Sequence, residues 1–271
     1  MKTVRLNSWG SFKNQINDLF ADSAKRRIDT NRYVSTPIFR GHADSRWKLE
    51  TTLEREFSEE MKLEYFYSTL LYPTLNMLRG VIDLTQLSEP MRKVSDIPFR
   101  DLARLLPSVE QMAWLRHHGA VSPLLDWTYS PYVAAYFAFS PPINSEKGNV
   151  AIFAFREYLG QGKGYQESKA RIGVHGRWMP VHTRHIRQQS LYTVCVRSAR
   201  GGPVFSSHER AELDRPFKQI EFDAIIKFEI PAAERQIALE DLTRMNVTEY
   251  SLFETQDALI KTVSRFASVS D

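Results

Sequence analysis

The 271-residue chain contains a single cysteine, Cys195. One thiol cannot form an internal disulfide framework, and it excludes a metal site built from clustered cysteines. Cys195 lies in the apolar run 192–196, which favours a buried structural thiol over a nucleophile. The sequence therefore places no redox or cysteine chemistry at the centre of the function.

Long hydrophobic runs and a strong charge excess are also missing. No run approaches the roughly 18 apolar residues of a membrane span, and the N-terminus lacks the apolar core of a signal peptide. These two absences predict a cytoplasmic protein without a membrane partner. The formal net charge of +4 is too small to indicate a nucleic-acid-binding protein by itself. P-loop, GxGxxG, GxSxG and HExxH motifs are absent, which disfavours the commonest nucleotide, serine-hydrolase and zinc-protease sites.

Apolar periodicity predicts a single α+β domain over residues 1–271, with its core at about 34–260. Helices dominate the first half, and most strands fall in the second. The expected helices are 9–23, 52–78 with a break near Pro73, 101–118 restarted at Pro107, 131–139, 231–245 and 253–266. The expected strands are 34–40, 121–127, 149–156, 191–197 and 222–230, with a loop-rich insertion at 160–189.

The stretch 38–42 reads as a short apolar strand that ends in polar groups. Arg40 offers a planar fork of donors for phosphate or carboxylate, and Gly41 lets the backbone approach a ligand closely. Pro37 suggests an edge position or an irregularity in this strand. Two interpretations of Arg40 remain open at this point. It is either an anion clamp or a structural arginine paired with Asp44 or Asp126.

The stretch 124–131 places a carboxylate and two hydroxyls at a strand-to-helix junction. Ser130 is explained by a helix N-cap before Pro131. Asp126 and Thr128 are not needed for that cap, so they are candidates for ligand contact. Tyr129, with Trp127, either forms a wall for a planar ring or packs in the core.

Histidines and basic residues cluster elsewhere. His117 and His118 end a predicted helix before Gly119, where the helix dipole favours a capping role. His175, His182 and His185 are spaced too irregularly to predict a metal site. The segment 163–200 is either a solvated loop or a contact for nucleic acid or pyrophosphate. Its basic residues are Lys163, Lys169, Arg171, Arg177, Arg184, Arg187, Arg197 and Arg200.

Taken together, these motifs resemble the FRG domain, a bacterial and phage family with a Phe-Arg-Gly signature. That signature is Phe39-Arg40-Gly41 here, and 117–119 with 124–138 is similar to the family's QHxG…LLDWTxSPxxAxxFA pattern. Two weaker blocks follow, at 184–192 and 252–259. The resemblance spans 36–259.

A more distant resemblance is to ADP-ribosyltransferases. It implies an ADP-ribosyltransferase-like mixed or antiparallel β core with an N-terminal helical region and flanking helices. It also implies that NAD⁺ is the substrate, held by the pocket residues Arg40, Gly41, His42, Asp126, Thr128, Tyr129 and Ser130. Arg40 would clamp the phosphate or ribose, and Thr128 would shape the nicotinamide pocket.

The resemblance also requires an acid that stabilises an oxocarbenium-like state. Gln188 stands near the expected position, but an amide lacks the negative charge. Glu221, in Gln219-Ile220-Glu221, has the right form one strand later. Arg40, Thr128, Gln188 and Glu221 are therefore the expected catalytic residues, and Asp126 is the substitute acid.

The leading hypothesis is transfer of ADP-ribose to a protein or nucleic-acid acceptor. The setting would be a bacterial or phage toxin, effector or defence component, with a possible neutralising partner protein. One alternative is a non-catalytic module that binds a nucleotide or nucleic acid through the same pocket and segment 163–200. A second alternative is another enzyme class that acts on a phosphorylated substrate through Arg40 and Asp126.

Overall fold

A computed structural model describes most of the chain. The described residues are 1–28, 33–57, 60–81, 93–141, 148–160, 169–176, 179, 183–211 and 223–269. Glu221, Gln219, Trp178 and His182 lie outside them, as do Lys163 and Arg177 of the basic segment.

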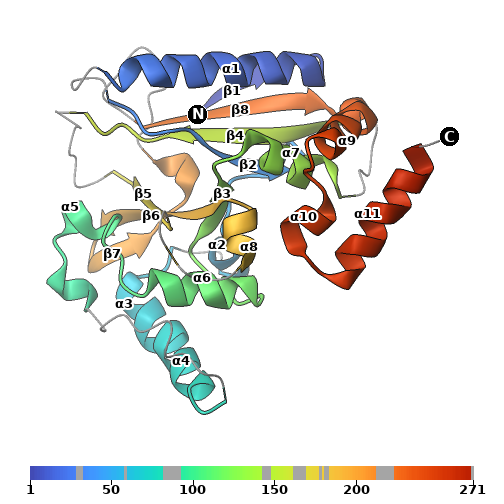
Figure 1. Ribbon diagram of the computed structural model, residues 1–271. Helices are drawn as coiled ribbons and strands as arrows, with labels where there is room; N and C mark the ends of the chain where they lie inside the picture. The colour runs from blue at the N-terminus through green and yellow to red at the C-terminus, as the bar shows by residue number, and fades with distance from the viewer. Residues whose placement is uncertain are drawn as a thin grey trace.

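One mixed sheet organises the fold (Figure 1). Its strand order is β1-β8-β4-β2-β3-β6-β5, and β7 pairs with β6. Only β1 and β8 run parallel to each other among the described pairs. The strands are β1 Lys2–Arg5, β2 Ile38–His42, β3 Leu125–Thr128, β4 Asn149–Arg156, β5 Arg171–His175, β6 Ser190–Ala199, β7 Gly202–Phe205 and β8 Ala224–Pro231.

Helices pack around this sheet, which confirms the predicted α+β class. They are α1 Trp9–Arg26, α2 Thr52–Glu56, α3 Leu63–Tyr65, α4 Tyr72–Leu78, α5 Phe99–Leu102, α6 Val109–His117, α7 Pro131–Phe139, α8 Thr183–Arg187, α9 Arg235–Arg244, α10 Glu249–Phe253 and α11 Gln256–Val269. In Figure 1, α1 lies along β8 and β4, whereas α6 lies on the opposite side of the molecule, below β3 and β6.

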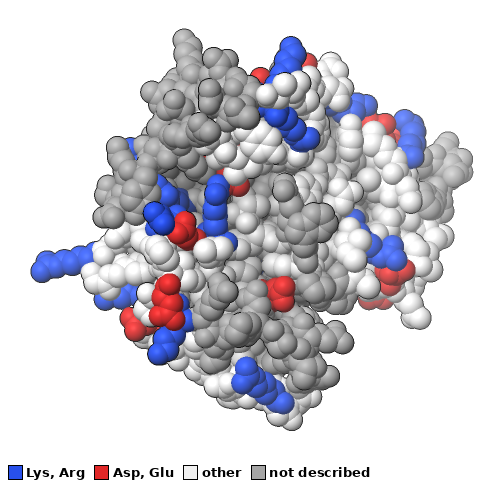
Figure 2. All heavy atoms as spheres, turned by 60° about the vertical axis from the view of Figure 1, so that its left-hand side comes forward, with Lys and Arg blue, Asp and Glu red and all other residues white. Residues whose placement is uncertain are grey.

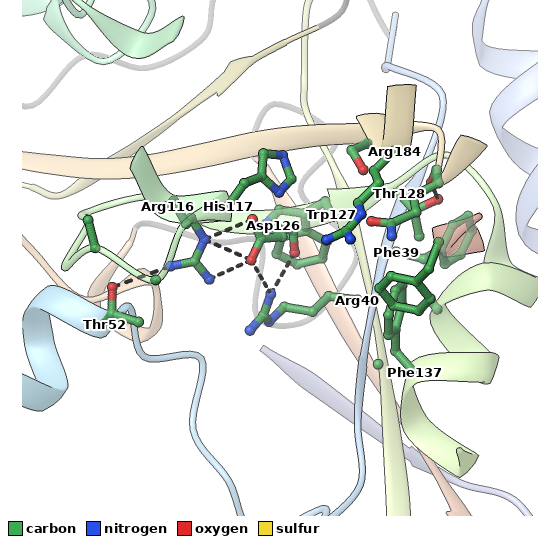
Figure 3. Close-up of a pocket in the computed structure, with 17 residues that line it drawn as sticks. Phe39, Arg40, Thr52, Arg116, His117, Asp126, Trp127, Thr128, Phe137 and Arg184 are labelled. Carbon is green, nitrogen blue, oxygen red and sulfur yellow. Dashed lines mark hydrogen bonds and ion pairs between the residues drawn. The ribbon is translucent and has the colours of Figure 1, made fainter. Parts of the chain in front are cut away.

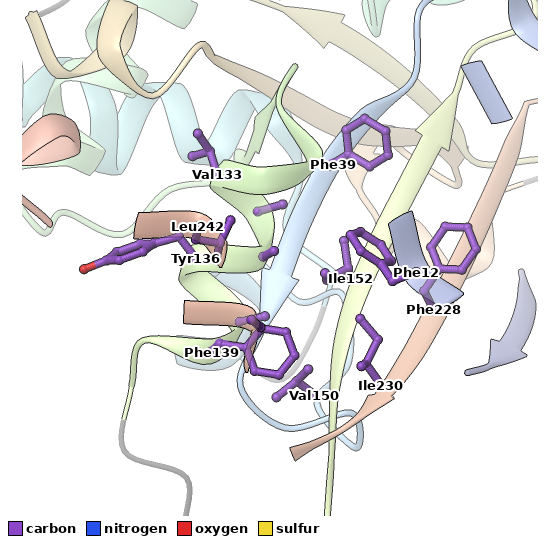
Figure 4. Packing of buried hydrophobic residues seen from close by; sticks show 14 of the residues in the cluster. Phe12, Phe39, Val133, Tyr136, Phe139, Val150, Ile152, Phe228, Ile230 and Leu242 are labelled. Carbon is purple, nitrogen blue, oxygen red and sulfur yellow. The ribbon is translucent and has the colours of Figure 1, made fainter. Parts of the chain in front are cut away.

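Helix α7 seals one half of the sheet (Figure 4). Ser130 caps it, because its side chain accepts a hydrogen bond from the amide of Val133, as predicted. Phe39 of β2, Phe139 of α7 and Phe12 of α1 meet in one buried cluster. This cluster holds α1 and α7 on the same face of β2, β4 and β8.

The strand registers show where the sheet opens. β2 pairs with β4 over five residues but with β3 only through Phe39 and Thr128. Directly opposed residues point to the same face, so Thr128, and Asp126 two residues earlier, share the face of Phe39. Asp126 is opposed by Tyr192 of β6, which belongs to a second cluster, with α6. The two helical clusters therefore cover neighbouring halves of one face, and the β2–β3 ladder ends between them.

Several expected elements form as predicted, and others need correction. Helix α7 and strand β4 match the expected ranges 131–139 and 149–156. β2 is a central strand rather than an edge strand, because Pro37 precedes its first residue and removes no ladder donor. The expected insertion at 160–189 contains β5, which pairs with β6, and helix α8.

The helical region 52–78 also differs from the expectation. The interruption falls after α2, whose C-cap is Phe57, and not at Pro73. Pro73 is the second residue of α4, directly after the π-helical segment Phe66–Leu71 that joins α4 to α3, so the helix changes type there without ending. Helix α6 does start after Pro107, but Ser108 has a left-handed backbone (φ 57°) and makes no capping bond. Ser108 and Gln111, whose spacing in the sequence is that of a capping box, therefore do not form one.

Two sequence expectations concern burial and membranes. Cys195 is buried, and burial raises the pKa of its thiol well above the ordinary value, which confirms a structural role. Among the described residues, no helix combines the length and the apolar character needed to cross a bilayer.

Candidate functional site

A pocket of about 510 Å³ lies where β2 and β3 separate (Figure 3). Its size falls within the range of small-molecule sites. Arg40 and Asp126 lie on its wall, together with Thr128 and Gln188. Four of the residues singled out in the sequence, from β2, β3 and the segment after α8, are thus brought together by the fold.

Arg40 crosses the gap between the two strands. Its neighbours Ile38 and His42 point to the same side of β2, and its guanidinium reaches over to β3. Nη1 donates to the backbone oxygen of Asp126 (2.7 Å), and Nε donates to Nε2 of His42 (3.0 Å). No hydrogen bond donated by Nη2 of Arg40 is found within the described parts of the chain. The guanidinium is therefore held in place with one donor group left for a ligand.

Burial sets the charge states of Arg40 and His42. Burial lowers the pKa of Arg40 to about 10, helped by repulsion from Arg116, so the guanidinium stays charged at neutral pH. Burial, with the charge of Arg40, also lowers the pKa of His42 to about 3. His42 is consequently neutral and accepts the Arg40 hydrogen bond. His42 orients the Arg40 guanidinium through this hydrogen bond but does not itself line the pocket.

Asp126 is bound chiefly by Arg116, a residue that the sequence did not single out. Nε of Arg116 lies 2.8 Å from both carboxylate oxygens, Nη2 also bonds Oδ2, and Nη1 donates to Thr52 (3.3 Å). Arg40 is farther away, with 3.7 Å between Nη1 and Oδ2. Although burial raises the pKa of Asp126, Arg116 and then Arg40 outweigh it and hold this pKa below its usual value. The carboxyl group is therefore ionised at neutral pH.

Both interpretations of Arg40 hold in part. The guanidinium pairs with Asp126, as the structural interpretation predicts, whereas Asp44 is taken by Arg46 at 2.6 Å. However, Arg116 satisfies Asp126 more closely, so Arg40 is not consumed by the pair. Arg40 thus keeps the capacity to bind an anion in the pocket.

Gly41 permits the close contact that shapes the pocket. A Cβ on Gly41 would lie 1.9 Å from the backbone oxygen of Ala134 in α7. Only glycine allows β2 and α7 to pack this closely. Gly41 and Ala134 both line the pocket, so this close contact is part of its lining.

Thr128 and Gln188 are engaged in local structure as well as lining the pocket. The Thr128 hydroxyl donates to the backbone oxygen of Gln188 (2.6 Å) and accepts from the amide of Ser130 (3.0 Å). The Gln188 side chain donates to the backbone oxygen of Leu252 at 3.3 Å. These bonds fix the wall formed by β3, α8 and α10. Tyr129 and Ser130 do not line the pocket, because Tyr129 packs against the opposite core cluster and Ser130 caps α7.

Sequence reasoning missed several contributors. His117, expected to cap α6, lines the pocket, and its Nε2 lies 2.8 Å from the Tyr192 hydroxyl. His118 is the residue that ends the helix and bonds the backbone oxygen of Trp114. Phe137 and Phe253 provide apolar walls. The position of Phe137 in the helix that begins after Ser130 is the one sequence signal that could have indicated an apolar wall. Phe253 reaches the pocket through tertiary packing, which the sequence does not reveal.

The basic segment 163–200 is partly neutralised. Arg187 pairs with Glu254 at 2.5 Å, and Arg197 is bound by Glu60. On the face drawn in Figure 2, the coloured basic and acidic side chains lie interspersed. Among the described basic residues of this segment, Arg184 lines the pocket, with its guanidinium 5.6 Å from the ring centre of Phe253. The positive charge that the described part of this segment brings to the pocket therefore comes from Arg184.

Metal binding finds no support in the described residues. No group of three or more histidine, cysteine, aspartate or glutamate side chains comes together there as a metal site would require. His175 bonds the backbone oxygen of Ala103, and His185 that of Gly176. Glu221, the expected catalytic acid, lies outside the described residues.

Comparison with known proteins places these motifs in a family. The FRG domain model matches residues 35–147, which include Arg40-Gly41, His117 and Asp126. The two weaker blocks at 184–192 and 252–259 lie beyond the match. No curated protein and no solved structure matches the chain. Residues 35–147 are thus an FRG domain, and this domain supplies every residue that lines the pocket except Arg184, Gln188, Ser190 and Phe253.

Proposed function

We propose that this chain binds NAD⁺ in the pocket between β2 and β3 and transfers its ADP-ribose to a protein or nucleic-acid acceptor. The observation that carries the proposal is the convergence of a held arginine, an ionised carboxylate and aromatic walls in one pocket. The sheet would then be of the ADP-ribosyltransferase-like kind. A cytoplasmic bacterial or phage toxin, effector or defence component is the setting that we propose for it.

The charges around the pocket suit a pyrophosphate. Arg40, Arg116 and Arg184 bring three positive charges and Asp126 one negative charge. The balance of +2 would be met by the two negative charges of a dinucleotide pyrophosphate. Arg40 is the preferred contact, because its guanidinium is oriented in advance by His42 and the β3 backbone. Such charge-assisted bonds are the strong ones in anion recognition.

Asp126 is the acid that we propose in place of the expected glutamate. Cleavage of the nicotinamide–ribose bond develops positive charge on the ribose, and a fixed carboxylate stabilises that charge. The Asp126 side chain is 42% exposed although Arg116 binds it, so part of the carboxylate faces the pocket. Because Arg116 fixes the carboxylate, no reorganisation is needed when the charge develops.

Aromatic side chains supply surfaces for the planar rings of the substrate. Phe137 and Phe253 both line the pocket and meet edge to face, with 6.1 Å between ring centres. Flat apolar rings of this kind stack with nucleobases and with nicotinamide. The pocket therefore offers a charged end and an apolar end, as a nucleotide requires.

Arg40→Gln should weaken NAD⁺ binding at least tenfold, which corresponds to about 1.4 kcal/mol. Glutamine keeps much of the side-chain length but removes the charge and the fork. Isothermal titration calorimetry with NAD⁺ measures the change. Arg46→Gln is the matched control, since Arg46 is 87% exposed and, within the described part of the chain, forms its ion pair with Asp44. Equal NAD⁺ affinity in wild type and Arg40→Gln would contradict the clamp.

One observation favours a second candidate, a module that binds a nucleotide without turning it over. The bidentate contact from Arg116 neutralises much of the Asp126 charge. Nicotinamide release, followed by chromatography in wild type and Asp126→Asn, separates the two candidates. The transferase requires release that Asp126→Asn abolishes. Binding of NAD⁺ without any release would favour the module.

A further inference from the structure

The aromatic end of the pocket is built by α7, α8 and α10. Phe253, the last residue of α10, meets Phe137 of α7 edge to face, with 6.1 Å between ring centres. The guanidinium of Arg184 in α8 lies over the Phe253 ring, 5.6 Å from its centre. All three side chains line the pocket. This end therefore combines apolar rings with a planar positive charge.

The chain on both sides of Phe253 is tied to α8. Before it, the backbone oxygen of Leu252 accepts a hydrogen bond from the side chain of Gln188, the residue after α8, at 3.3 Å. After it, Glu254 pairs with Arg187 of α8 at 2.5 Å. Glu254 also has a left-handed backbone (φ 53°), which few residues other than glycine adopt, and it ends α10 at this point. The fold thus fixes the backbone around Phe253 and presents a preformed surface to a ligand.

An aromatic ring beside a guanidinium is a surface that suits a nucleobase. Bases stack on aromatic side chains and on the planes of arginine side chains, because every base has a π face. Phe253 is only partly buried, so its ring remains accessible from the pocket. The surface formed by Phe253 and Arg184 is therefore a candidate for one of the two rings of NAD⁺.

Charge distinguishes between these two rings. The nicotinamide ring of NAD⁺ is positively charged, whereas adenine is neutral near pH 7. Asp126 is the acidic side chain among the described residues that line the pocket, and Arg184 brings a positive charge close to Phe253. In Figure 3, Phe137 lies at one end of the drawn site and the Arg116–Asp126 ion pair toward the other. Coulombic interactions thus favour nicotinamide near Asp126 and disfavour it near Arg184.

We infer that the adenine base of NAD⁺ binds against Phe253, beside Arg184, and that the nicotinamide ring faces Asp126. This inference rests on the proposed function, because it assigns the two rings of the proposed substrate to two ends of the same pocket. The orientation also agrees with the role proposed for Asp126, which requires the nicotinamide ribose close to its carboxylate. Phe253 lies outside the FRG domain at 35–147, so base recognition belongs to the C-terminal part of the chain.

AMP and nicotinamide mononucleotide test the inference, because they share ribose 5-phosphate and differ in the ring. Phe253→Leu should weaken AMP binding by about fivefold or more, the loss expected when one base–aromatic stack is removed. The same variant should keep the affinity for nicotinamide mononucleotide within about twofold of wild type. Asp126→Asn should act in the opposite sense and lower the affinity for nicotinamide mononucleotide relative to AMP. Isothermal titration calorimetry measures these affinities.

Two further variants separate loss of the ring from a general loss of structure. Phe253→Tyr keeps an aromatic ring and should bind AMP as wild type does. Tyr250→Leu replaces an aromatic residue in the same helix at a position that is 40% exposed, and it should leave both affinities unchanged. NMR of the wild-type protein with ADP-ribose needs no variant. We expect nuclear Overhauser effects between the adenine protons and the Phe253 ring, and adenine contacts to another wall instead would overturn the inference.

The outcomes separate this inference from the proposed function. If wild type binds NAD⁺ and Phe253→Leu keeps the wild-type affinity for AMP, the base does not bind at Phe253 although the proposed function stands. If Phe253→Leu weakens nicotinamide mononucleotide and spares AMP, the orientation is reversed and the inference is overturned. If wild type binds neither NAD⁺ nor AMP, the proposed function and the inference fail together.

Discussion

Gly41→Ala should destabilise the protein by about 2 kcal/mol or more, which is the range of overpacked cores. The new methyl group would lie 1.9 Å from the backbone oxygen of Ala134 and 2.8 Å from the backbone nitrogen of Ala138. Both atoms belong to the backbone of α7, so no side chain can rotate to make room. The helix must move away from β2, and Phe137 moves with it.

Binding should suffer along with stability, because Gly41, Ala134 and Phe137 all line the pocket. Urea denaturation and calorimetry with NAD⁺ measure the two effects. Gly10→Ala is the matched control. Gly10 is exposed in α1, and its nearest atom would be 3.8 Å from the new methyl, so we expect equal or greater stability there. Wild-type stability in Gly41→Ala would show that β2 and α7 are not packed as closely as described.

Arg116→Met should cost about 2 kcal/mol of folding stability. Methionine fills a similar volume but leaves Asp126 with Arg40 as its remaining ion-pair partner, at 3.7 Å. Loss of one member of a fully buried pair costs about 3–5 kcal/mol, and the partial exposure of Asp126 reduces this figure. Arg100→Met is the control, because Arg100 forms an exposed pair with Asp101 and should change stability by less than about 0.5 kcal/mol.

A double-mutant cycle and a pH series test the origin of this effect. Arg116→Met combined with Asp126→Asn should destabilise the protein by less than the sum of the two single changes.

The pH dependence of stability provides a second test of the ion pair. Since folding lowers the pKa of Asp126, the unfolded state binds more protons at acidic pH. The pair's contribution is complete above the ordinary carboxyl pKa of about 3.9 and is lost as pH falls through the lower folded value. A stability difference between wild type and Asp126→Asn that stays constant down to pH 2 would contradict this ion pair.

Local sequence signals predicted much of the fold. Ser130-Pro131 marked the start of α7, and the apolar run 149–156 marked β4, because a cap and a long buried strand depend on neighbouring residues alone. Strands β1, β5 and β7 were not predicted. They are only four or five residues long, and they gain their stability from pairing with distant strands.

The candidate site was predicted only in part, because some of its residues have local sequence signals and others do not. Arg40, Asp126 and Thr128 were identified because each is a polar residue that follows a short apolar run in the sequence. Arg116 and His117 were not, since their roles arise from the register that sets Asp126 opposite Tyr192. The position of Gln188 was predicted, but its bond to the backbone of Leu252 depends on the packing of α8 against α10.

The strand order has a consequence for synthesis on the ribosome. β1 is made first, yet its partner β8 ends at Pro231, so the first residues of the sheet wait for most of the chain to emerge. Contacts so distant in sequence close slowly. A nascent chain that has just exposed β8 still lacks Phe253 and the Leu252 backbone that holds Gln188. The completed pocket therefore forms late, and a growing chain has no finished pocket until α10 has folded against α8.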